Sequence, residues 1–299
     1  MSQGIARVVA TFGRHALIET DTRRRLHAHL RGRRADVVVG DLVRWQPAGD
    51  EAVIEAVELR RNLLRRQDAW RTKNFAANLD QVLLLVAVEP PLSEGQLTRA
   101  LVAAADAGIT ALVGLNKIDR PGSDAARARL APYRGFGLEV IEFAAKAEPQ
   151  ATREALLPRL QQRTTLLLGP SGAGKSTLIN LLVPDAEAQV GEISAALNAG
   201  RHTTTSTRWY WLGPGHDSAL IDSPGFQQFG LQHLAPEQLA ALMPDLAAQL
   251  GGCRFYNCSH RQEPGCAVRA AVDDGRIDAQ RYRLYLEIHD ELSRAGGAG

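Results

Sequence analysis

The sequence has few cysteines and no long apolar stretch. Only three of its 299 residues are cysteine, and all lie between Cys253 and Cys266, which excludes a disulfide framework spread over the chain. The longest apolar stretch, residues 101–115, contains Asp106 and is shorter than a membrane-spanning helix. The first four residues do not begin an apolar signal segment. We therefore expect a cytoplasmic protein without a membrane anchor.

Charge is nearly balanced over the whole chain but not along it. The formal net charge is +2, yet residues 1–75 hold 15 lysines and arginines against 9 acidic residues, and the remainder holds 20 against 24. A basic end of this kind suggests contact with a polyanion. The hydrophobic content of 45% and the chain length fit a globular protein of two or three domains.

Residues 1–70 have the pattern of a small all-β domain. Short apolar or alternating runs predict about five strands, at 5–10, 15–19, 36–39, 41–45 and 52–57. Five short strands in this length fit a closed barrel such as the OB-fold. Residues 62–78 are interpreted as a basic linker to the next part of the chain.

An arginine-rich segment at residues 23–34, which also holds two histidines, lies between these strands. It could neutralise several phosphates of a nucleic acid, and a solvated charged loop is the alternative. Over residues 1–57 only Phe12 and Trp45 are aromatic, so stacking on single-stranded bases is poorly supported. Contact with the backbone of structured RNA is the better hypothesis.

The pattern changes to alternating strands and helices after residue 80. Continuous apolar runs predict strands covered on both faces, at 82–88, 109–115, 138–143, 164–168 and 218–221. Helical spacing at Leu97, Leu101 and Ala104, and over residues 151–162, separates several of them. Such alternation indicates a parallel α/β sheet with ligand loops at the carboxyl ends of its strands.

One glycine-rich loop follows the fourth of these strands and precedes a helix. It reads G-x-x-x-x-G-K-S, a phosphate-binding P-loop, in Gly169, Pro170, Ser171, Gly172, Ala173, Gly174, Lys175 and Ser176. Its glycines let backbone N–H groups turn toward phosphate oxygens, and the helix N-terminus adds partial positive charge. Lys175 would contact the β- and γ-phosphates, Ser176 would bind Mg²⁺, and Thr177 belongs to the same nucleotide contacts. The sequence therefore predicts a nucleoside triphosphate site.

A second motif, N-K-x-D at residues 116–119, follows another buried strand. Asp119 can accept hydrogen bonds from guanine N1–H and N2–H₂, a donor pair that adenine lacks. Asn116 can bond the other edge of the ring or tie loops together, and the Lys117 stem can cover the face of the base. The motif therefore favours GTP over ATP.

Two more loops complete a GTPase set. Residues 144–146, Ala-Ala-Lys, stand where many GTPases have S-A-K, so the Ala145 N–H is expected to reach guanine O6 with Lys146 beside it. The D-x-x-G motif follows the last predicted strand. In it Asp222 would hold Mg²⁺ through water, and the Gly225 N–H would sense the γ-phosphate.

A threonine switch is expected in residues 201–205, between the P-loop and D-x-x-G. One threonine would bind Mg²⁺ and close over the γ-phosphate, and Thr204 is preferred over Thr203 and Thr205. Typical GTPases place N-K-x-D and S-A-K after the switches, whereas here these motifs come first. The set is complete but circularly permuted, which preserves the site because the original chain ends can lie close together.

The C-terminal cysteines share a compact pattern with one histidine. It reads C-x4-C-x-H-x5-C in Cys253, Cys258, His260 and Cys266. Three thiolates and one imidazole match a closed tetrahedral zinc site, and free cytosolic thiols are the alternative. Such an ion would be structural, since no coordination position stays open for catalysis. A helix at residues 277–292 is expected to pack against this segment.

A basic barrel, permuted GTPase motifs and this cysteine pattern together resemble one family, the circularly permuted GTPases of small ribosomal subunit biogenesis (RsgA, also called YjeQ). The resemblance implies an OB-fold at residues 1–70, a permuted GTPase domain at 71–230 and a helical zinc-binding domain at 231–299. It implies GTP hydrolysis stimulated by the small ribosomal subunit, rRNA contact and a role in late maturation of that subunit. We expect a monomer that binds GTP and GDP, with Zn²⁺ and Mg²⁺ as cofactors.

The residue after D-x-x-G is Phe226, where many GTPases place a glutamine that orients water. The family similarly has an apolar residue there. His202, beside the threonine switch, is then the candidate to orient the attacking water, with Lys175 and Thr204 in the same catalytic set. A loop residue or an RNA contact is the alternative for His202. Weak intrinsic turnover that rises when a partner orders the switch is expected.

Two other functions stay open on the sequence alone. A translation-type GTPase would act on mature ribosomes or tRNA. A nucleotide-gated RNA-binding module would use GTP binding, with hydrolysis incidental.

Overall fold

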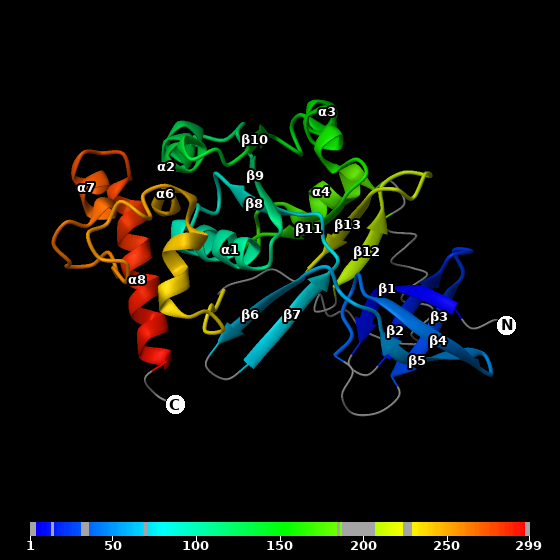
Figure 1. Ribbon diagram of the computed structural model, residues 1–299. Coiled ribbons are helices and arrows are strands. Elements are labelled where there is room, and N and C mark those ends of the chain that lie inside the picture. Colours follow the sequence, from blue (N-terminus) through cyan, green and yellow to red (C-terminus); the bar gives the residue numbers. More distant parts are fainter. Residues whose placement is uncertain are drawn as a thin grey trace.

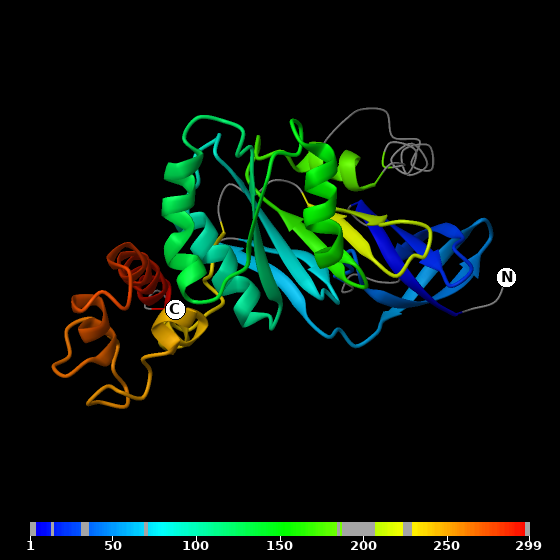
Figure 2. The same cartoon turned by 90° about the horizontal axis from the view of Figure 1, so that it is seen from above.

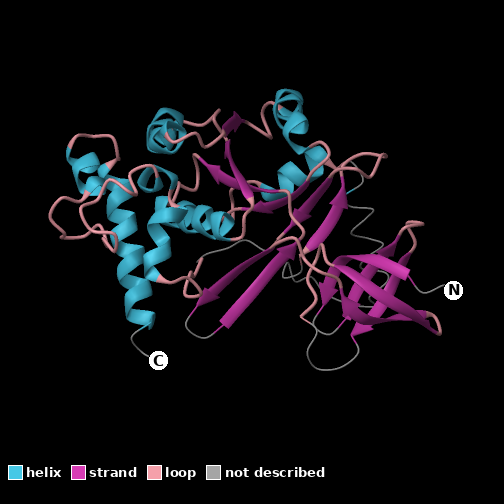
Figure 3. Ribbon diagram, viewed as in Figure 1, coloured by secondary structure: helices cyan, strands magenta, loops and turns pink. Residues whose placement is uncertain are grey.

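The computed structural model describes residues 4–12, 15–30, 36–68, 71–183, 186, 207–223 and 229–296. A β-barrel lies at one end of the molecule, a sheet flanked by helices lies in the middle, and a group of helices lies at the other end (Figures 1 and 2). The first part consists of strands, the middle part combines strands with helices, and helices dominate the last part (Figure 3). None of the helices described is long and apolar enough to span a bilayer. Domain boundaries at residues 70 and 230 stay predictions.

The N-terminal part is a closed barrel of five strands, β1 (Gly4–Phe12), β2 (His15–Thr20), β3 (Arg25–Leu30), β4 (Leu42–Ala48) and β5 (Glu51–Val57). They pair in the order β1-β2-β3-β5-β4, and β4 returns to β1. Only β3 and β5 run parallel among these pairs. Val8, Ile18, Val43 and Ile54 fill the interior. The expected OB-type barrel is confirmed.

One barrel strand lies within the arginine-rich segment. Residues 25–30 form β3, so the interpretation of this whole stretch as a charged loop is wrong. Leu26 and Ala28 are buried in the barrel, while His27 and His29, which alternate with them, are partly exposed. The alternation of a strand therefore continues through a run whose charge suggests a loop. Residues 31–35 lie outside the described part of the chain.

The central sheet consists of β8 (Gln81–Ala87), β9 (Thr110–Asn116), β10 (Val140–Phe143), β11 (Thr164–Leu168), β12 (Arg208–Trp211) and β13 (Ala219–Asp222). Its order is β10-β9-β8-β11-β13-β12, with β12 antiparallel to β13 and the other pairs parallel. The predicted parallel α/β sheet is confirmed, and β12 is an addition that the apolar pattern did not reveal.

Two layers of helices cover this sheet, formed by α1 (Glu94–Asp106), α2 (Ser123–Gly135), α3 (Pro149–Leu160) and α4 (Lys175–Leu182). Leu97 of α1 and Leu130 of α2 share one core with Leu84 of β8. Leu156 of α3 shares the opposite core with Leu83 of β8, and so does α4. Successive strand residues point to opposite faces, which is why the strands read as unbroken apolar runs.

The barrel and the central sheet form one continuous 11-stranded sheet. Strand β1 of the barrel pairs antiparallel with β12 through Ala10 and Arg208. The same Arg208 pairs with Asp222 at the end of β13. Strand β12 therefore stands between the barrel and the D-x-x-G strand.

The segment interpreted as a basic linker is a hairpin, formed by β6 (Leu63–Asp68) and β7 (Arg71–Ala77). The linker interpretation is wrong because the hairpin has a docking partner far along the chain. Gln67 donates its N–H to the Gly230 carbonyl at 3.0 Å and accepts from the Gln232 N–H at 3.1 Å. Phe75 stacks on Phe229 at 5.4 Å between ring centroids.

The C-terminal part contains η1 (Pro236–Leu242), α6 (Pro244–Ala247), α7 (Ala267–Asp273) and α8 (Ala279–Gly296). The helix expected at 277–292 is confirmed as α8, whose Tyr285, Ile288 and Leu292 are buried. η1 lies against both α8 and α1. The C-terminal part is therefore packed on the helix layer of the central sheet.

Candidate nucleotide and metal sites

The P-loop connects β11 to α4 in a conformation that requires glycine. A Cβ on Gly169 would lie 2.5 Å from the Leu85 carbonyl oxygen, and Gly174 has a φ of +103°. Lys175 begins α4, and its Nζ donates to the carbonyls of Gly169 at 2.7 Å and Pro170 at 3.1 Å. Burial lowers the pKa of Lys175, which the nearby Asp222 partly opposes. The loop thus holds a cation beside a helix N-terminus, which suits a phosphate group.

The polar residues of the P-loop face outward. Ser171, Ser176 and Thr177 are exposed, whereas Ala173 is buried. The hydroxyls of Ser176 and Thr177 belong to the first turn of α4. They are accessible to a phosphate and its counter-ion, and their nucleotide and Mg²⁺ roles stay predictions.

Asn116 ties three loops together at the end of β9. Its Nδ2 donates to the Ala173 carbonyl at 2.9 Å, and its Oδ1 accepts from the N–H groups of Ala145 at 3.1 Å and Lys117 at 2.8 Å. The side chain is buried. Of the two roles open to Asn116, this geometry supports loop positioning over contact with the ring edge.

Lys117 spans the gap between the guanine motif and the P-loop. Its Nζ donates to the Glu89 carbonyl at 2.6 Å and to the Gly172 carbonyl at 2.8 Å. Pro90 lies close to Gly172. The loop after β8 therefore lies against the P-loop, a contact that the sequence patterns did not predict. Its position at the carboxyl end of a buried parallel strand could have indicated this role.

Asp119 follows on the exposed side of the same motif. Its side chain is 34% exposed and lies 3.6 Å from the Arg120 guanidinium. The adjacent Ile118 N–H donates to the Phe143 carbonyl at 3.4 Å, which holds the 116–119 loop beside the loop after β10. Ala145 is buried and Lys146 is exposed there. The parallel strands β9 and β10 thus bring both guanine motifs together, as their positions at strand ends predict.

Asp222 ends β13 next to the strand that leads into the P-loop, in register with Leu167 of β11. Burial raises the pKa of Asp222 to about 6, against the opposing charges of Lys175 and Arg208. Ser223 donates its hydroxyl to the Leu167 carbonyl at 3.2 Å. A divalent cation would restore the ionised carboxylate, so this residue fits the chemistry of a Mg²⁺ site.

Several predicted residues lie outside the described residues. They are the switch residues His202, Thr203, Thr204 and Thr205, and Gly225 and Phe226 after Asp222. Their roles stay predictions.

The cysteines and the histidine of the C-terminal part form one cluster. The ligand atoms of Cys253, Cys258, His260 and Cys266 all lie within 4.8 Å of one another. His260 Nδ1 is 3.5 Å from the Sγ atoms of Cys253 and Cys266. A tetrahedral zinc–thiolate site spaces its ligands by about 3.8 Å, so these four groups can hold a metal ion.

Donors around the cluster support the thiolate form of the cysteines. The Ala267 N–H donates to Cys253 Sγ at 3.4 Å, and the Arg269 N–H donates to Cys266 Sγ at 3.5 Å. Burial, together with the neighbouring thiols, raises the pKa of Cys258 to about 12. A bound cation would reverse that shift, because metal binding requires the thiolate.

Hydrogen bonds from α8 and from one carboxylate hold the metal-binding loop. Tyr282 and Tyr285 donate their hydroxyls to the carbonyls of His260 at 2.7 Å and Ser259 at 2.8 Å. Glu263 accepts from the Ser259 N–H at 2.7 Å and the Arg261 N–H at 3.0 Å. Burial raises the pKa of Glu263, but these hydrogen bonds outweigh it and hold the pKa well below its usual range.

Comparisons with known proteins agree with this architecture. The model of the RsgA GTPase family matches residues 57–232. A relative from Variovorax paradoxus, called Small ribosomal subunit biogenesis GTPase RsgA, is 55% identical over 96% of this chain and 92% of its own length. A relative of the same name from Bordetella pertussis is 54% identical over 96% of both chains.

Solved structures share the fold over nearly the whole chain. The crystal structure of YjeQ from Thermotoga maritima has a TM-score of 0.75 at 27% identity and covers 97% of this chain and 99% of its own. YloQ, a circularly permuted GTPase, has a TM-score of 0.71 at 24% identity and covers 98% and 96%. The chain therefore belongs to the RsgA GTPase family and is an enzyme that hydrolyses GTP on a circularly permuted fold.

Proposed function

We propose that this GTPase acts in late maturation of the small ribosomal subunit, as a GTP-controlled switch that works as a monomer in the cytoplasm. The observation that carries the proposal is the position of the N-terminal barrel and of the C-terminal part. Both adjoin the part of the chain that contains D-x-x-G. The barrel pairs with β12 beside Asp222, and residues 230–232 pair with β6 shortly after the motif. A change at the γ-phosphate could thus reach two surfaces that face a large partner.

The name shared by the close relatives supports the choice of partner. Proteins 50–55% identical to this chain over 96% of its length are called Small ribosomal subunit biogenesis GTPase RsgA. The basic barrel fits the rRNA of such a subunit, because arginines bind phosphates in any sequence context. We assign rRNA binding to the arginine-rich face that includes Arg23, Arg24 and Arg25.

Asp119 is the residue proposed to read the guanine base. Asn116 and Lys117 are engaged by the loops around them, while the Asp119 carboxylate is partly exposed at the same site. Asp119→Asn is expected to weaken GTP binding about 100-fold and to favour xanthosine triphosphate, because the donor pair of guanine loses its acceptor. Asp124→Asn, at an exposed position of α2, is the control. Unchanged GTP affinity in Asp119→Asn would remove the guanine assignment.

The phosphates are proposed to lie on the first turn of α4, with Lys175, Ser176 and Thr177 as ligands. Magnesium would be held by Ser176, by Thr204 and, through water, by Asp222, and it would neutralise charge on the β- and γ-phosphates. A bound cation would lower the pKa of the Asp222 carboxyl, which burial raises to about 6, and so favour its ionised form. Lys175 stabilises the negative charge that develops during hydrolysis.

His202 is proposed to orient the attacking water, because Phe226 has no group that can do so. Subunit-stimulated turnover should fall by about 100-fold in His202→Ala, within the range expected for a lost acid–base group. Nucleotide affinity should stay unchanged. Undiminished stimulated turnover would show that another group orients the water.

Zinc is the ion proposed for Cys253, Cys258, His260 and Cys266. Three thiolates and one imidazole form a soft, four-membered donor set, which suits zinc and leaves no open position for chemistry. Metal analysis of purified protein should find one zinc ion per chain. Iron or no tightly bound metal would contradict this assignment.

The decisive test of the proposed function is GTP turnover with and without isolated small ribosomal subunits, at stated salt. Turnover is expected to rise at least tenfold with subunits and to require physiological rather than high salt. Equal turnover in both conditions would overturn the proposal. A preference for mature over immature subunits would favour a translation-type GTPase instead.

A further inference from the structure

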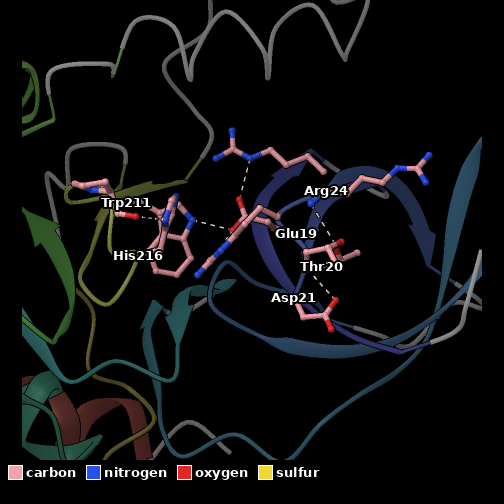
Figure 4. Close-up of polar contacts among 10 residues, drawn as sticks. Glu19, Thr20, Asp21, Arg24, Trp211 and His216 are labelled. Atoms are coloured by element: carbon pink, nitrogen blue, oxygen red, sulfur yellow. Dashed lines mark hydrogen bonds and ion pairs between the residues drawn. The ribbon is translucent and has the colours of Figure 1, made fainter.

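The junction between barrel and GTPase sheet contains a buried carboxylate that none of these roles uses. Glu19 lies on β2, and its side chain is 4% exposed. Its Oε1 accepts from Trp211 Nε1 at 2.8 Å and from Arg23 Nη1 at 3.1 Å, and its Oε2 accepts from Arg25 Nε at 3.0 Å. Figure 4 shows Glu19 in the barrel facing Trp211 of β12. One carboxylate thus joins two arginines of the basic face to a strand of the GTPase sheet.

The turn between β2 and β3 points Arg23 at the same strand. Thr20 donates its N–H to the Arg24 carbonyl at 3.0 Å, and Thr20 Oγ1 accepts from the Arg24 N–H at 3.2 Å. Arg23 has a φ of 64°, in the left-handed region. Its guanidinium lies 4.6 Å from the Trp211 ring centroid, although its side chain is 46% exposed. Arg23 therefore contacts β12 on one side and is open to solvent on the other.

Strand β12 connects these contacts to the nucleotide site through described residues. Trp211 pairs with Ala219, and at the other end of β12 Arg208 pairs with Asp222. The charge of Arg208 opposes the rise in the pKa of Asp222 that burial causes. A displacement of this short strand would change the distance between Arg208 and the carboxylate, and so the field at Asp222.

We propose that Glu19 is a positioning residue for subunit-stimulated GTP hydrolysis. RNA phosphates that bind Arg23 and Arg25 compete with Glu19 for the same guanidinium groups. The carboxylate then loses its cationic partners, its contact with Trp211 changes, and β12 shifts relative to Asp222. RNA binding on the barrel is thereby coupled to the GTPase site. This inference rests on the proposed function, because the RNA is that of the small subunit.

The test compares Glu19→Gln with wild type in three measurements, namely basal turnover, stimulated turnover and affinity for small subunits. Glutamine keeps the shape and an oxygen that can accept from Trp211, but it removes the negative charge that competes with phosphates for Arg23 and Arg25. Basal turnover and the KM for GTP should change less than about twofold. Stimulated turnover should fall about tenfold, within the usual range of coupling between sites, while subunit affinity is retained.

Two further variants keep the result interpretable. Glu58→Gln removes a carboxylate that pairs with Arg44 at 3.0 Å elsewhere on the barrel, and it should leave stimulation unchanged. Trp211→Phe removes the indole donor but keeps a ring beside Arg23, and it should lower stimulation as Glu19→Gln does. If Glu19→Gln folds poorly, Trp211→Phe tests the same contact from the other side.

The possible outcomes separate a failure of the proposed function from a failure of the coupling role of Glu19. If wild type is not stimulated by subunits, the proposed function fails. If wild type is stimulated and Glu19→Gln is stimulated equally, the coupling role of Glu19 is overturned and its contacts are only structural. If Glu19→Gln loses subunit affinity in proportion to stimulation, the residue shapes a binding surface and does not couple it to hydrolysis.

Discussion

The GTPase sheet is joined to its two neighbours in different ways. On the barrel side, Glu19 is buried but its partner Arg23 is nearly half exposed. On the C-terminal side, Arg281 is almost completely buried. It donates to both oxygens of Asp245, at 2.8 and 2.9 Å, and to Thr98 at 2.8 Å, with its guanidinium over the Tyr133 ring.

The difference lies in how water can reach each charge. Solvent and phosphates have access to Arg23, so its ion pair is screened and can be exchanged for another partner. Arg281 has no such access, and removing either partner would leave an uncompensated buried charge. We infer that the C-terminal part is held rigidly on α1 and α2, whereas the barrel junction can respond to RNA.

Metal removal should have the greatest effect, because it acts on the rigidly held C-terminal part. Chelation should expose residues 253–266, because a structural metal site supplies most of the folding free energy of such a loop, about 10 kcal/mol in small zinc domains. Amide hydrogen exchange of this loop and of α8 measures the effect. Tyr256→Ser, a change at an exposed residue of the same loop, should keep the metal. Unaltered protection after chelation would contradict a structural ion.

Substitution of Arg281 tests the buried junction directly. Arg281→Met should lower the free energy of unfolding by about 3–5 kcal/mol, because Asp245 is left as an unpaired buried charge. Urea denaturation of the metal-bound protein measures it. The double variant Arg281→Met with Asp245→Leu should recover much of the loss. A double variant as unstable as the single one would place the effect in packing and not in charge.

Asp222 lies where the barrel junction reaches the nucleotide site, and it should make stability depend on pH. Its pKa is about 6 when folded against an ordinary value of 3.8, so the folded state binds this proton more tightly. The stabilisation that this protonated carboxyl contributes is therefore fully present below about pH 4 and is lost as pH rises through 6. The loss lowers the free energy of unfolding by about 3 kcal/mol at most. Asp222→Asn should remove this loss in nucleotide-free protein without Mg²⁺, as measured by urea denaturation. An identical pH dependence in both proteins would refute the raised pKa.

Substitution of Arg23, on the exposed side of the barrel junction, should change stability least. Arg23→Gln should cost less than about 1 kcal/mol of unfolding free energy, since the ion pair is solvated and its contact with Trp211 is a partly exposed cation–π interaction. Added salt should reduce the difference between Arg23→Gln and wild type. A loss as large as that of Arg281→Met would abolish the distinction between the two junctions.

Local motifs were the part of the site that could be predicted from the sequence. The P-loop, N-K-x-D and the cysteine pattern each consist of residues within a few positions of one another. Their geometry follows from a short loop and the element that it begins or ends. Burial of strands such as 82–88 could be predicted for a similar reason, since an unbroken apolar run requires cover on both faces.

Partners far apart in the chain were beyond the reach of these patterns. Arg281 and Thr98 are 183 positions apart, and Glu19 and Trp211 are 192 apart. The β6–β7 hairpin was interpreted as a linker because basic residues obscure its strand pattern and because its partner, residues 230–232, lies far along the chain. Strand β12 was missed because four residues are too few to show a period.

The guanine nucleotide site and the metal cluster could be read from the amino-acid order, because both depend on residue type at short spacing. How the barrel and the C-terminal part are connected to the nucleotide site became visible only in the folded structure. Asn116 holds loops together, and Glu19 and Arg281 connect neighbouring parts of the molecule. Folding buries these residues beside distant partners that no local pattern identifies. The energy of a buried polar group depends on whether such partners satisfy it, and many of them come from distant parts of the chain.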